Sequence, residues 1–268
     1  MKHCLLIILC LIGSSCLVNA QMDDKFYYPS KKMQPIDSSL KVEEVVFQTD
    51  TIQLSGILLK PTQKPKATIL FYHGAGGNVS TYIFMTKPLV NAGYQVFMVD
   101  FRGYGKSTGV PTHLNIAQDG QLILEQLLKR NDVRNTKVIL YGASMGSQVA
   151  THLAKNNEAK VAALILDGAI SSFTDIAADH SPAAQRDMIR QFLPSPYSAK
   201  EDIKLVQKIP VLFIHSKEDK DVPYHQGEAV FNNAPGKKSF LVYEGKHLEA
   251  MKTDPGKVIE SINQLISK

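Results

Sequence analysis

The chain contains a series of short, nearly continuous apolar runs that are separated by longer amphipathic segments. Strands that are covered by helices on both faces have this composition, which is typical of a parallel sheet. Two runs near the start, with a short polar break between them, predict a hairpin that opens the sheet. The predicted strands are residues 42–48, 52–59, 67–72, 94–99, 137–141, 161–166, 211–215 and 239–243.

Helical patterns lie between these runs, at residues 81–91, 114–130, 148–155, 226–232 and about 255–266. Parallel strands need long crossover connections, which are usually helices. The alternation of strands and helices therefore predicts one doubly wound α/β domain over residues 42–268.

Residues 171–207 interrupt this alternation. They contain Pro182, Pro194 and Pro196, and a single short helical pattern at residues 183–192. Prolines at this density end helices and strands, so the segment is interpreted as an insertion between two strands. We expect it to form a small cap over the C-terminal ends of the strands.

The start of the chain has a different character from the rest. Residues 1–20 combine a basic start, an apolar run at residues 4–12 and a small-residue end at Ala20, which is the anatomy of a secretory signal peptide. The apolar run is shorter than the roughly 20 residues that cross a membrane comfortably. We expect cleavage after Ala20 and export to the periplasm or the exterior. Two alternatives stay open, a lipid anchor at Cys16 and an uncleaved N-terminus, and either would attach the protein to a membrane.

Residues 21–41 are polar, contain Pro29 and Pro35, and show no sustained period. This pattern predicts an extended N-terminal extension, or linker, that leads into the domain.

Composition narrows the classes of chemistry. All three cysteines lie within residues 1–20, so a chain cleaved after Ala20 has no disulfide, no thiolate metal site and no cysteine nucleophile. The net charge of +5 is scattered, and the densest basic clusters are short pairs such as Lys31-Lys32. A nucleic-acid partner is therefore not expected. The histidines show no metal-ligand spacing with cysteine or carboxylate, so neither a metal nor an organic cofactor is predicted.

The sharpest chemical signal is the sequence GASMG at residues 142–146, which lies between a predicted strand and a predicted helix. This is the G-x-S-x-G pattern in the context where it forms a nucleophile elbow. The tight turn makes the Ser144 hydroxyl project from the sheet, and the flanking glycines allow the helix backbone to pack closely. The N–H of Met145 and the helix N-terminus would stabilise a developing oxyanion.

A second glycine-rich sequence, HGAGGN at residues 73–78, follows the strand at residues 67–72. We expect the N–H of Ala75 to face the same pocket as that of Met145, because two convergent donors make an oxyanion hole. His73 is interpreted as a structural residue that joins neighbouring loops.

A serine hydroxyl needs a base to remove its proton. His247 follows the last predicted strand, where a base would reach Ser144, and the orienting carboxylate should follow the strand at residues 211–215. Asp219 is the preferred carboxylate, with Asp221 and then Glu218 as alternatives.

These motifs together resemble those of the α/β-hydrolase superfamily, and most closely its Bem46-like and serine-aminopeptidase-like branch. The resemblance extends from about residue 42 to the C-terminus and rests on residues 73–78, 100–107 (DFRGYGKS), 142–146, 219–223 (DKDVP) and 245–247 (GKH). It implies the α/β-hydrolase fold. It also implies that His73, Gly74, Asp100 and Arg102 support the loops beside the site and have no catalytic role.

The predicted reaction is acyl transfer through an acyl-enzyme, with a small-molecule acyl ester as substrate, as in carboxylesterases. Alternatives are a serine peptidase or aminopeptidase, and a lysophospholipase or thioesterase. A more remote alternative is an inactive binding protein that kept the fold. The sequence does not specify the natural substrate or the oligomeric state.

Overall fold

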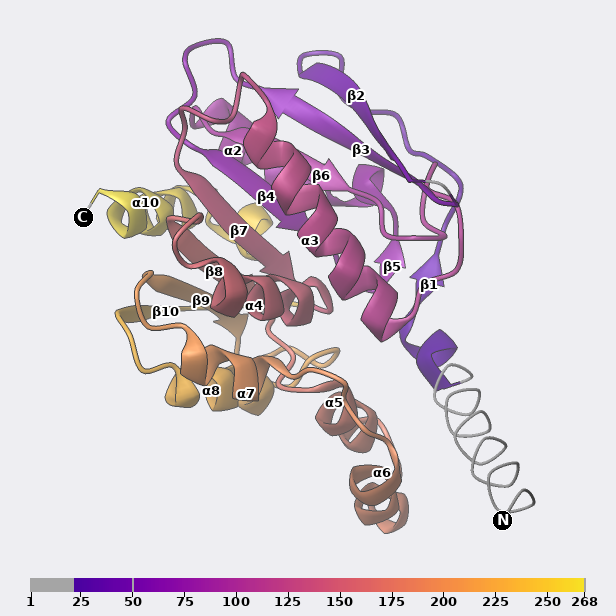
Figure 1. Ribbon diagram of the computed structural model, residues 1–268. Coiled ribbons are helices and arrows are strands. Elements are labelled where there is room, and N and C mark those ends of the chain that lie inside the picture. Colours follow the sequence, from indigo (N-terminus) through magenta and orange to yellow (C-terminus); the bar gives the residue numbers. More distant parts are fainter. Residues whose placement is uncertain (1–21, 50, 268) are drawn as a thin grey trace.

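A computed structural model describes residues 22–49 and 51–267 and contains a central eight-stranded sheet (Figure 1). The strand order is β10-β9-β8-β7-β4-β6-β3-β2, and all neighbours are parallel except at β3, which is antiparallel to both β2 and β6. The strands are β2 (Lys41–Gln48), β3 (Gln53–Lys60), β4 (Thr68–Tyr72), β6 (Gln95–Val99), β7 (Val138–Ala143), β8 (Ala163–Asp167), β9 (Val211–Ser216) and β10 (Lys238–Tyr243). The predicted doubly wound, mostly parallel α/β fold is confirmed.

Helices cover both faces of the sheet, and each face has its own apolar core. On β4, Leu70 and Tyr72 belong to one core, whereas Ile69 and Phe71 belong to the other, as the two-residue period of a strand requires. The first core includes residues of α3 (His113–Lys129), α4 (Gly146–Asn157) and α8 (Tyr224–Asn233). The second includes residues of α2 (Ile83–Asn91), α9 (Ala250–Thr253) and α10 (Pro255–Ile266).

The insertion at residues 171–207 contains more helix than the sequence predicts. The expected pattern at residues 183–192 forms η3 (Ala183–Gln185) and α6 (Arg186–Phe192), but α5 (Phe173–Asp179) precedes them, with its N-terminus capped by the Ser172 side chain. α5 and α6 project from the body of the protein, whereas α7 (Ala199–Asp202) and η4 (Ile203–Leu205) pack against it (Figure 1).

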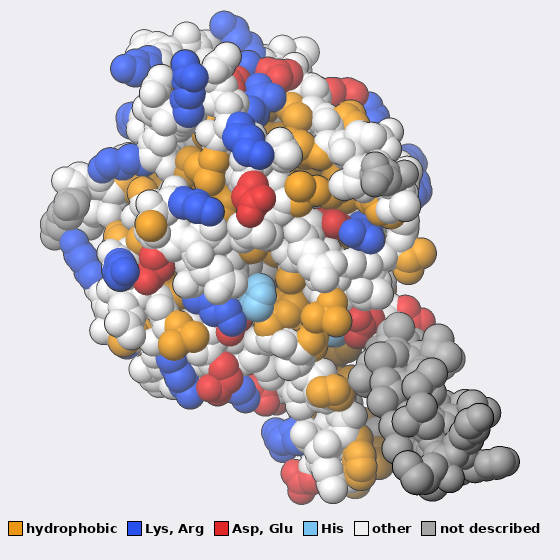
Figure 2. Space-filling model, in the orientation of Figure 1, with side chains coloured by type: hydrophobic (Ala, Val, Ile, Leu, Met, Phe, Trp, Pro, Cys, Tyr) orange, Lys and Arg blue, Asp and Glu red, His pale blue; other side chains and the backbone are white. Residues whose placement is uncertain are grey.

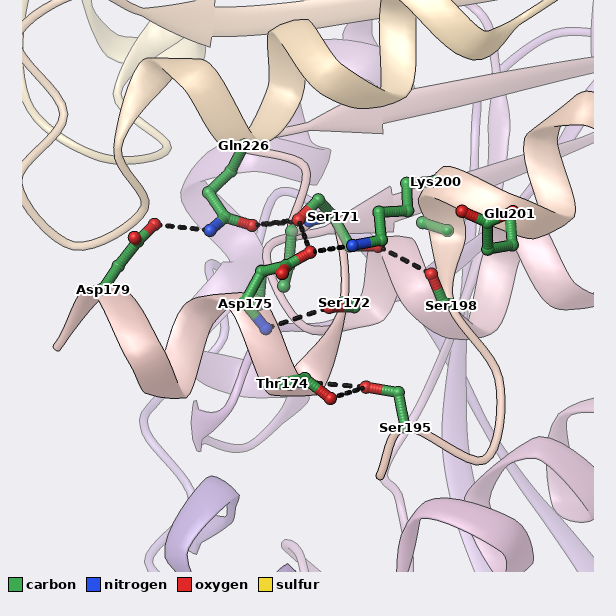
Figure 3. A network of polar contacts seen from close by, with 12 residues as sticks. Ser171, Ser172, Thr174, Asp175, Asp179, Ser195, Ser198, Lys200, Glu201 and Gln226 are labelled. Carbon is green, nitrogen blue, oxygen red and sulfur yellow. Dashed lines mark hydrogen bonds and ion pairs between the residues drawn. The ribbon is translucent and has the colours of Figure 1, made fainter. Parts of the chain in front are cut away.

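A network of polar contacts fixes α5 to the body of the protein (Figure 3). The Asp175 carboxylate accepts hydrogen bonds from the Lys200 ammonium at 2.5 Å and from the Ser171 hydroxyl at 2.8 Å. The Gln226 side chain from α8 joins Ser171 at one end of α5 to Asp179 at the other. α6 lies farther out and buries none of its own residues, so only the first half of the projecting cap is firmly anchored.

Residues 27–37, before β2, contain no helix, in keeping with the predicted extended lead-in, but they are not a free linker. η1 (Asp24–Phe26) is followed by β1 (Tyr28–Pro29), which pairs in parallel with β5 (Gly76–Gly77) in the loop after β4. The predicted signal peptide, with Ala20 and Cys16, lies outside the described residues. Within the part of the chain that the structure describes, no helix combines the length and the apolar character needed to span a membrane.

Charged side chains are scattered over the surface. Figure 2 shows basic side chains interspersed with acidic ones on one face, and apolar side chains on the projecting cap. Two residues of α6, Met188 and Phe192, are strongly exposed there.

Candidate active site

The turn between β7 and α4 holds Ser144 in a strained backbone conformation. Its φ is +52°, in the left-handed region that residues with a β-carbon rarely adopt, and its N–H donates to the carbonyl of Asp167 at 2.8 Å. A β-carbon on Gly142 would lie 2.6 Å from the carbonyl oxygen of Gly146, and one on Gly146 would lie 2.1 Å from the carbonyl oxygen of Tyr72. The two glycines are therefore required by close backbone packing, as a nucleophile elbow demands.

The loops after β9 and β10 bring Asp219 and His247 together. The Nδ1 atom of His247 and the Oδ2 atom of Asp219 are 2.6 Å apart, and the Asp219 carboxylate is fully buried. The other carboxylate oxygen of Asp219 accepts the N–H groups of Asp221 at 3.0 Å and Val222 at 2.8 Å. These backbone donors fix the carboxylate, which leaves one oxygen to orient the imidazole.

Ser144 and His247 line the same cavity, although no hydrogen bond joins their side chains in the described part of the structure. Catalytic hydrogen bonds are often long before a substrate binds and shorten in the substrate complex. Gly168 and Gly74, which have no side chains, leave room for the side chains of His247 and Ser144 in this cavity. A β-carbon on Gly168 would lie 2.6 Å from Cε1 of His247, and one on Gly74 would lie 3.3 Å from Cβ of Ser144.

Ala75 and Met145 also line this cavity. Neither N–H group has a hydrogen-bond partner among the described residues, so both are available to an oxygen of a bound molecule. The carbonyl of Ala75 is held from the other side by the N–H of Tyr28 at 2.9 Å and by the hydroxyl of Tyr104 at 2.6 Å.

The predicted supporting residues hold the loops around the site. His73 is buried, its Nδ1 atom lies 2.7 Å from the carbonyl oxygen of Gly74, and burial lowers its pKa to about 4. Asp100 accepts the N–H of Val79 at 2.8 Å, and burial raises its pKa to about 6. Arg102 forms a two-pronged ion pair with Asp119 of α3, at 2.6 and 2.7 Å, which fixes the loop after β6.

The cavity beside Ser144 has a volume of about 640 Å³, which suits a small organic substrate. Cap residues such as Phe173, Ile176 and Ile189 make much of its lining apolar. Asp221 is the only carboxylate side chain among its described lining residues. Within the described ranges, no cluster of histidine, cysteine and carboxylate side chains could hold a metal ion.

Asp167, which no sequence motif marks, lies at the C-terminal end of β8 beside the elbow. Its side chain is fully buried, Oδ2 accepts the Tyr141 hydroxyl at 2.7 Å, and Oδ1 has no partner among the described residues. Burial raises its pKa to about 7, although the nearby His247 acts to lower the pKa. The one sequence feature that could have indicated Asp167 is its position directly after the predicted strand at residues 161–166.

Asp167→Asn should make the stability of the fold less dependent on pH. Because burial raises the Asp167 pKa, the folded chain retains a proton that the unfolded chain loses, so this group destabilises the fold as pH rises from about 4 to about 7. The free energy of unfolding decreases by about 1.4 kcal/mol for each pH unit between the unfolded and the folded pKa of this group. As pH rises across this range, the melting temperature of Asp167→Asn should therefore increase relative to that of the wild type. A difference between the two proteins that stays constant with pH would contradict the prediction.

The fold and the arrangement of the site define a class, the α/β hydrolases, and the comparisons with known proteins agree. The model of the serine aminopeptidase family S33 matches residues 63–195. The uncharacterized protein YfhR of Escherichia coli K12 is 30% identical over 87% of this chain and 82% of its own length. The protein Bem46 of Schizosaccharomyces pombe is 30% identical over 74% of this chain and 67% of its own.

Solved structures show the same fold. The Pyrococcus furiosus esterase Pf2001 superposes with a TM-score of 0.73 at 17% identity and covers 90% of this chain and 98% of its own. A carboxyl esterase from Bacillus coagulans gives a TM-score of 0.65 at 17% identity, with coverage of 84% and 99%. The chain belongs to the α/β-hydrolase superfamily, in the group that includes YfhR and Bem46.

Proposed function

We propose that this hydrolase cleaves acyl esters with Ser144 as nucleophile, His247 as general base and Asp219 as the orienting carboxylate. The observation that carries the proposal is the strained Ser144 elbow facing the same cavity as a histidine whose Nδ1 is bound to a buried carboxylate. A serine, a base and a base-orienting group arranged in this way form the catalytic unit of serine hydrolases.

In the proposed reaction, Nδ1–H of His247 donates to Asp219, which leaves Nε2 free to accept the Ser144 proton. The serine oxygen forms a bond to the acyl carbon, and the carbonyl oxygen becomes negatively charged in front of the Ala75 and Met145 N–H groups. The imidazolium then protonates the departing alcohol, and the carbonyl forms again as the ester C–O bond breaks. Water releases the acyl group by the same steps, with His247 taking its proton.

The cavity favours an ester over a peptide with a free amino terminus. Capture of a substrate ammonium needs buried carboxylates, whereas the single carboxylate among the described lining residues, Asp221, is exposed. The largely apolar lining suits an uncharged acyl or alcohol group. Thioesters and lysophospholipids would use the same chemistry, and they are the alternatives against which esters should be measured.

A fluorophosphonate probe tests this proposal, because it reacts only with an activated serine. We expect labelling of the wild-type protein at the peptide that contains Ser144, as mapped by mass spectrometry, and no labelling of Ser144→Ala. Hydrolysis rates for p-nitrophenyl esters, an acyl thioester, a lysophospholipid and an aminoacyl nitroanilide should then be greatest for the esters. Absence of labelling in a folded wild-type protein would favour a binding protein without catalytic activity.

A further inference from the structure

Residues 22–31, which we name the N-terminal strap, lie against the loops that form the cavity (Figure 1). Four of them, Met22, Lys25, Phe26 and Tyr28, line the cavity beside Ser144. The sequence analysis predicted no contact between this segment and the site.

The strap is fixed at its first half by His113, the first residue of α3. The Tyr27 hydroxyl lies 2.6 Å from Nδ1 of His113. One carboxylate oxygen of Asp23 lies 3.2 Å from Nε2 of the same ring, and the other accepts the backbone N–H of His113 at 2.8 Å. Burial lowers the pKa of His113 to about 3, so the ring is neutral. Nδ1 of the neutral ring can then accept a hydrogen bond from the Tyr27 hydroxyl, while Nε2 faces the Asp23 carboxylate.

At its second half, the strap pairs with the loop that carries Ala75. Tyr28 and Pro29 run parallel to Gly76 and Gly77, and the N–H of Ser30 donates to the carbonyl of Gly77 at 2.9 Å. The Lys31 ammonium reaches the carbonyl of Ser107 at 2.6 Å. The strap therefore holds the loop that carries Ala75, the expected oxyanion loop, through backbone hydrogen bonds.

Within the first attachment, between Asp23 and Tyr27, the ring of Phe26 packs against His113 and the cap. Its ring meets His113 edge-on at 5.0 Å and Phe173 of α5 at 5.5 Å, and the His113 and Phe173 rings stack at 3.6 Å. Aromatic rings packed in these orientations are held in place more firmly than by burial alone. Phe26 thus forms part of the apolar wall of the cavity, and its ring is held by two aromatic neighbours.

We propose that the N-terminal strap is part of the substrate pocket and that Phe26 limits the length of the apolar group that an ester substrate can place there. This inference rests on the proposed function. The favoured substrates are esters whose apolar chain lies between the strap and α5, and the strap sets the length of chain that fits.

Substitutions of opposite size at Phe26 test this role. Phe26→Ala should shift the preferred p-nitrophenyl ester toward longer straight chains, and Phe26→Trp toward shorter ones, across a series from acetate to laurate. The ratio of kcat/KM between the longest and shortest esters should change by about tenfold in each direction, since a single apolar contact discriminates to that degree. Phe192→Ala is the matched control, because that ring is 71% exposed on α6 and does not line the cavity.

Three outcomes separate the two proposals. Opposite shifts in the two Phe26 variants, with an unchanged ratio in Phe192→Ala, support the inference. Ser144 labelling with the wild-type chain-length profile in both folded Phe26 variants overturns the inference and leaves the proposed function standing. A folded wild-type protein that neither reacts with the probe nor hydrolyses any ester overturns both. Thermal melting of every variant shows whether a lost rate reflects unfolding.

Discussion

Asp219→Asn should lower kcat by about 10⁴-fold while the protein stays folded. Oδ2 of Asp219 lies 2.6 Å from Nδ1 of His247, where the carboxylate can accept a hydrogen bond from an Nδ1–H group. An amide at this position can present its N–H₂ group to Nδ1, which favours the imidazole tautomer that cannot take the Ser144 proton. Single-turnover release of p-nitrophenol measures the loss directly, because it isolates formation of the acyl-enzyme.

Asp221→Asn is the informative comparison. Asp221 lies two residues after Asp219, lines the same cavity and was the alternative orienting acid. The carboxylate within hydrogen-bond distance of His247 is that of Asp219. We expect this variant to lose less than about tenfold in kcat, as is usual for a residue without a role in proton transfer. A larger loss in Asp221→Asn than in Asp219→Asn would show that the orienting acid is assigned incorrectly.

Gly146→Ala should destabilise the fold by about 3 kcal/mol and remove activity with it. The added β-carbon would lie 2.1 Å from the carbonyl oxygen of Tyr72 and 2.8 Å from that of His73. Both neighbours are backbone atoms at the end of β4, so the clash cannot be relieved by rotating a side chain. Chemical denaturation monitored by circular dichroism measures the change.

Gly76→Ala provides the matched control for this substitution. Gly76 lies in the loop with Ala75, and a β-carbon there would meet nothing within 4 Å. Its unfolding free energy should therefore stay within about 0.5 kcal/mol of the wild type. Equal destabilisation by the two substitutions would mean that the packing of α4 against β4 is looser than the structure indicates.

The sheet could be predicted from the sequence because its strands are buried on both faces. Every residue of β4, β6, β7, β8 and β9 is buried, so each strand gives a continuous apolar run that a local pattern can reveal. The positions of Ser144, Asp219 and His247 follow from the same pattern, since each comes directly after a predicted strand. Their catalytic roles remain predictions.

Other features depend on contacts that no local pattern contains. β1 and β5 are two residues long each, and the pairing of Tyr28 with Gly76 joins parts of the chain that are far apart in sequence. The sequence predicted an extended lead-in or linker but not this pairing, because the segment is polar and acquires its order from distant loops. Asp167 was missed for a related reason, because an isolated aspartate after a strand has no motif around it and only the fold places it beside His247.

The two halves of the proposed catalytic unit belong to parts of the sheet that differ in how firmly they are held. Ser144 follows β7, which has paired neighbours on both sides, whereas His247 follows β10, the half-exposed border strand. Border strands separate from a sheet at a lower cost in free energy than interior ones. Fraying at β10 would carry the imidazole away while the nucleophile and most of the fold remain in place. On the proposed mechanism, activity should be lost before the fold unfolds, and improving the pairing of β10 should extend the working range of the protein without changing a residue that touches substrate.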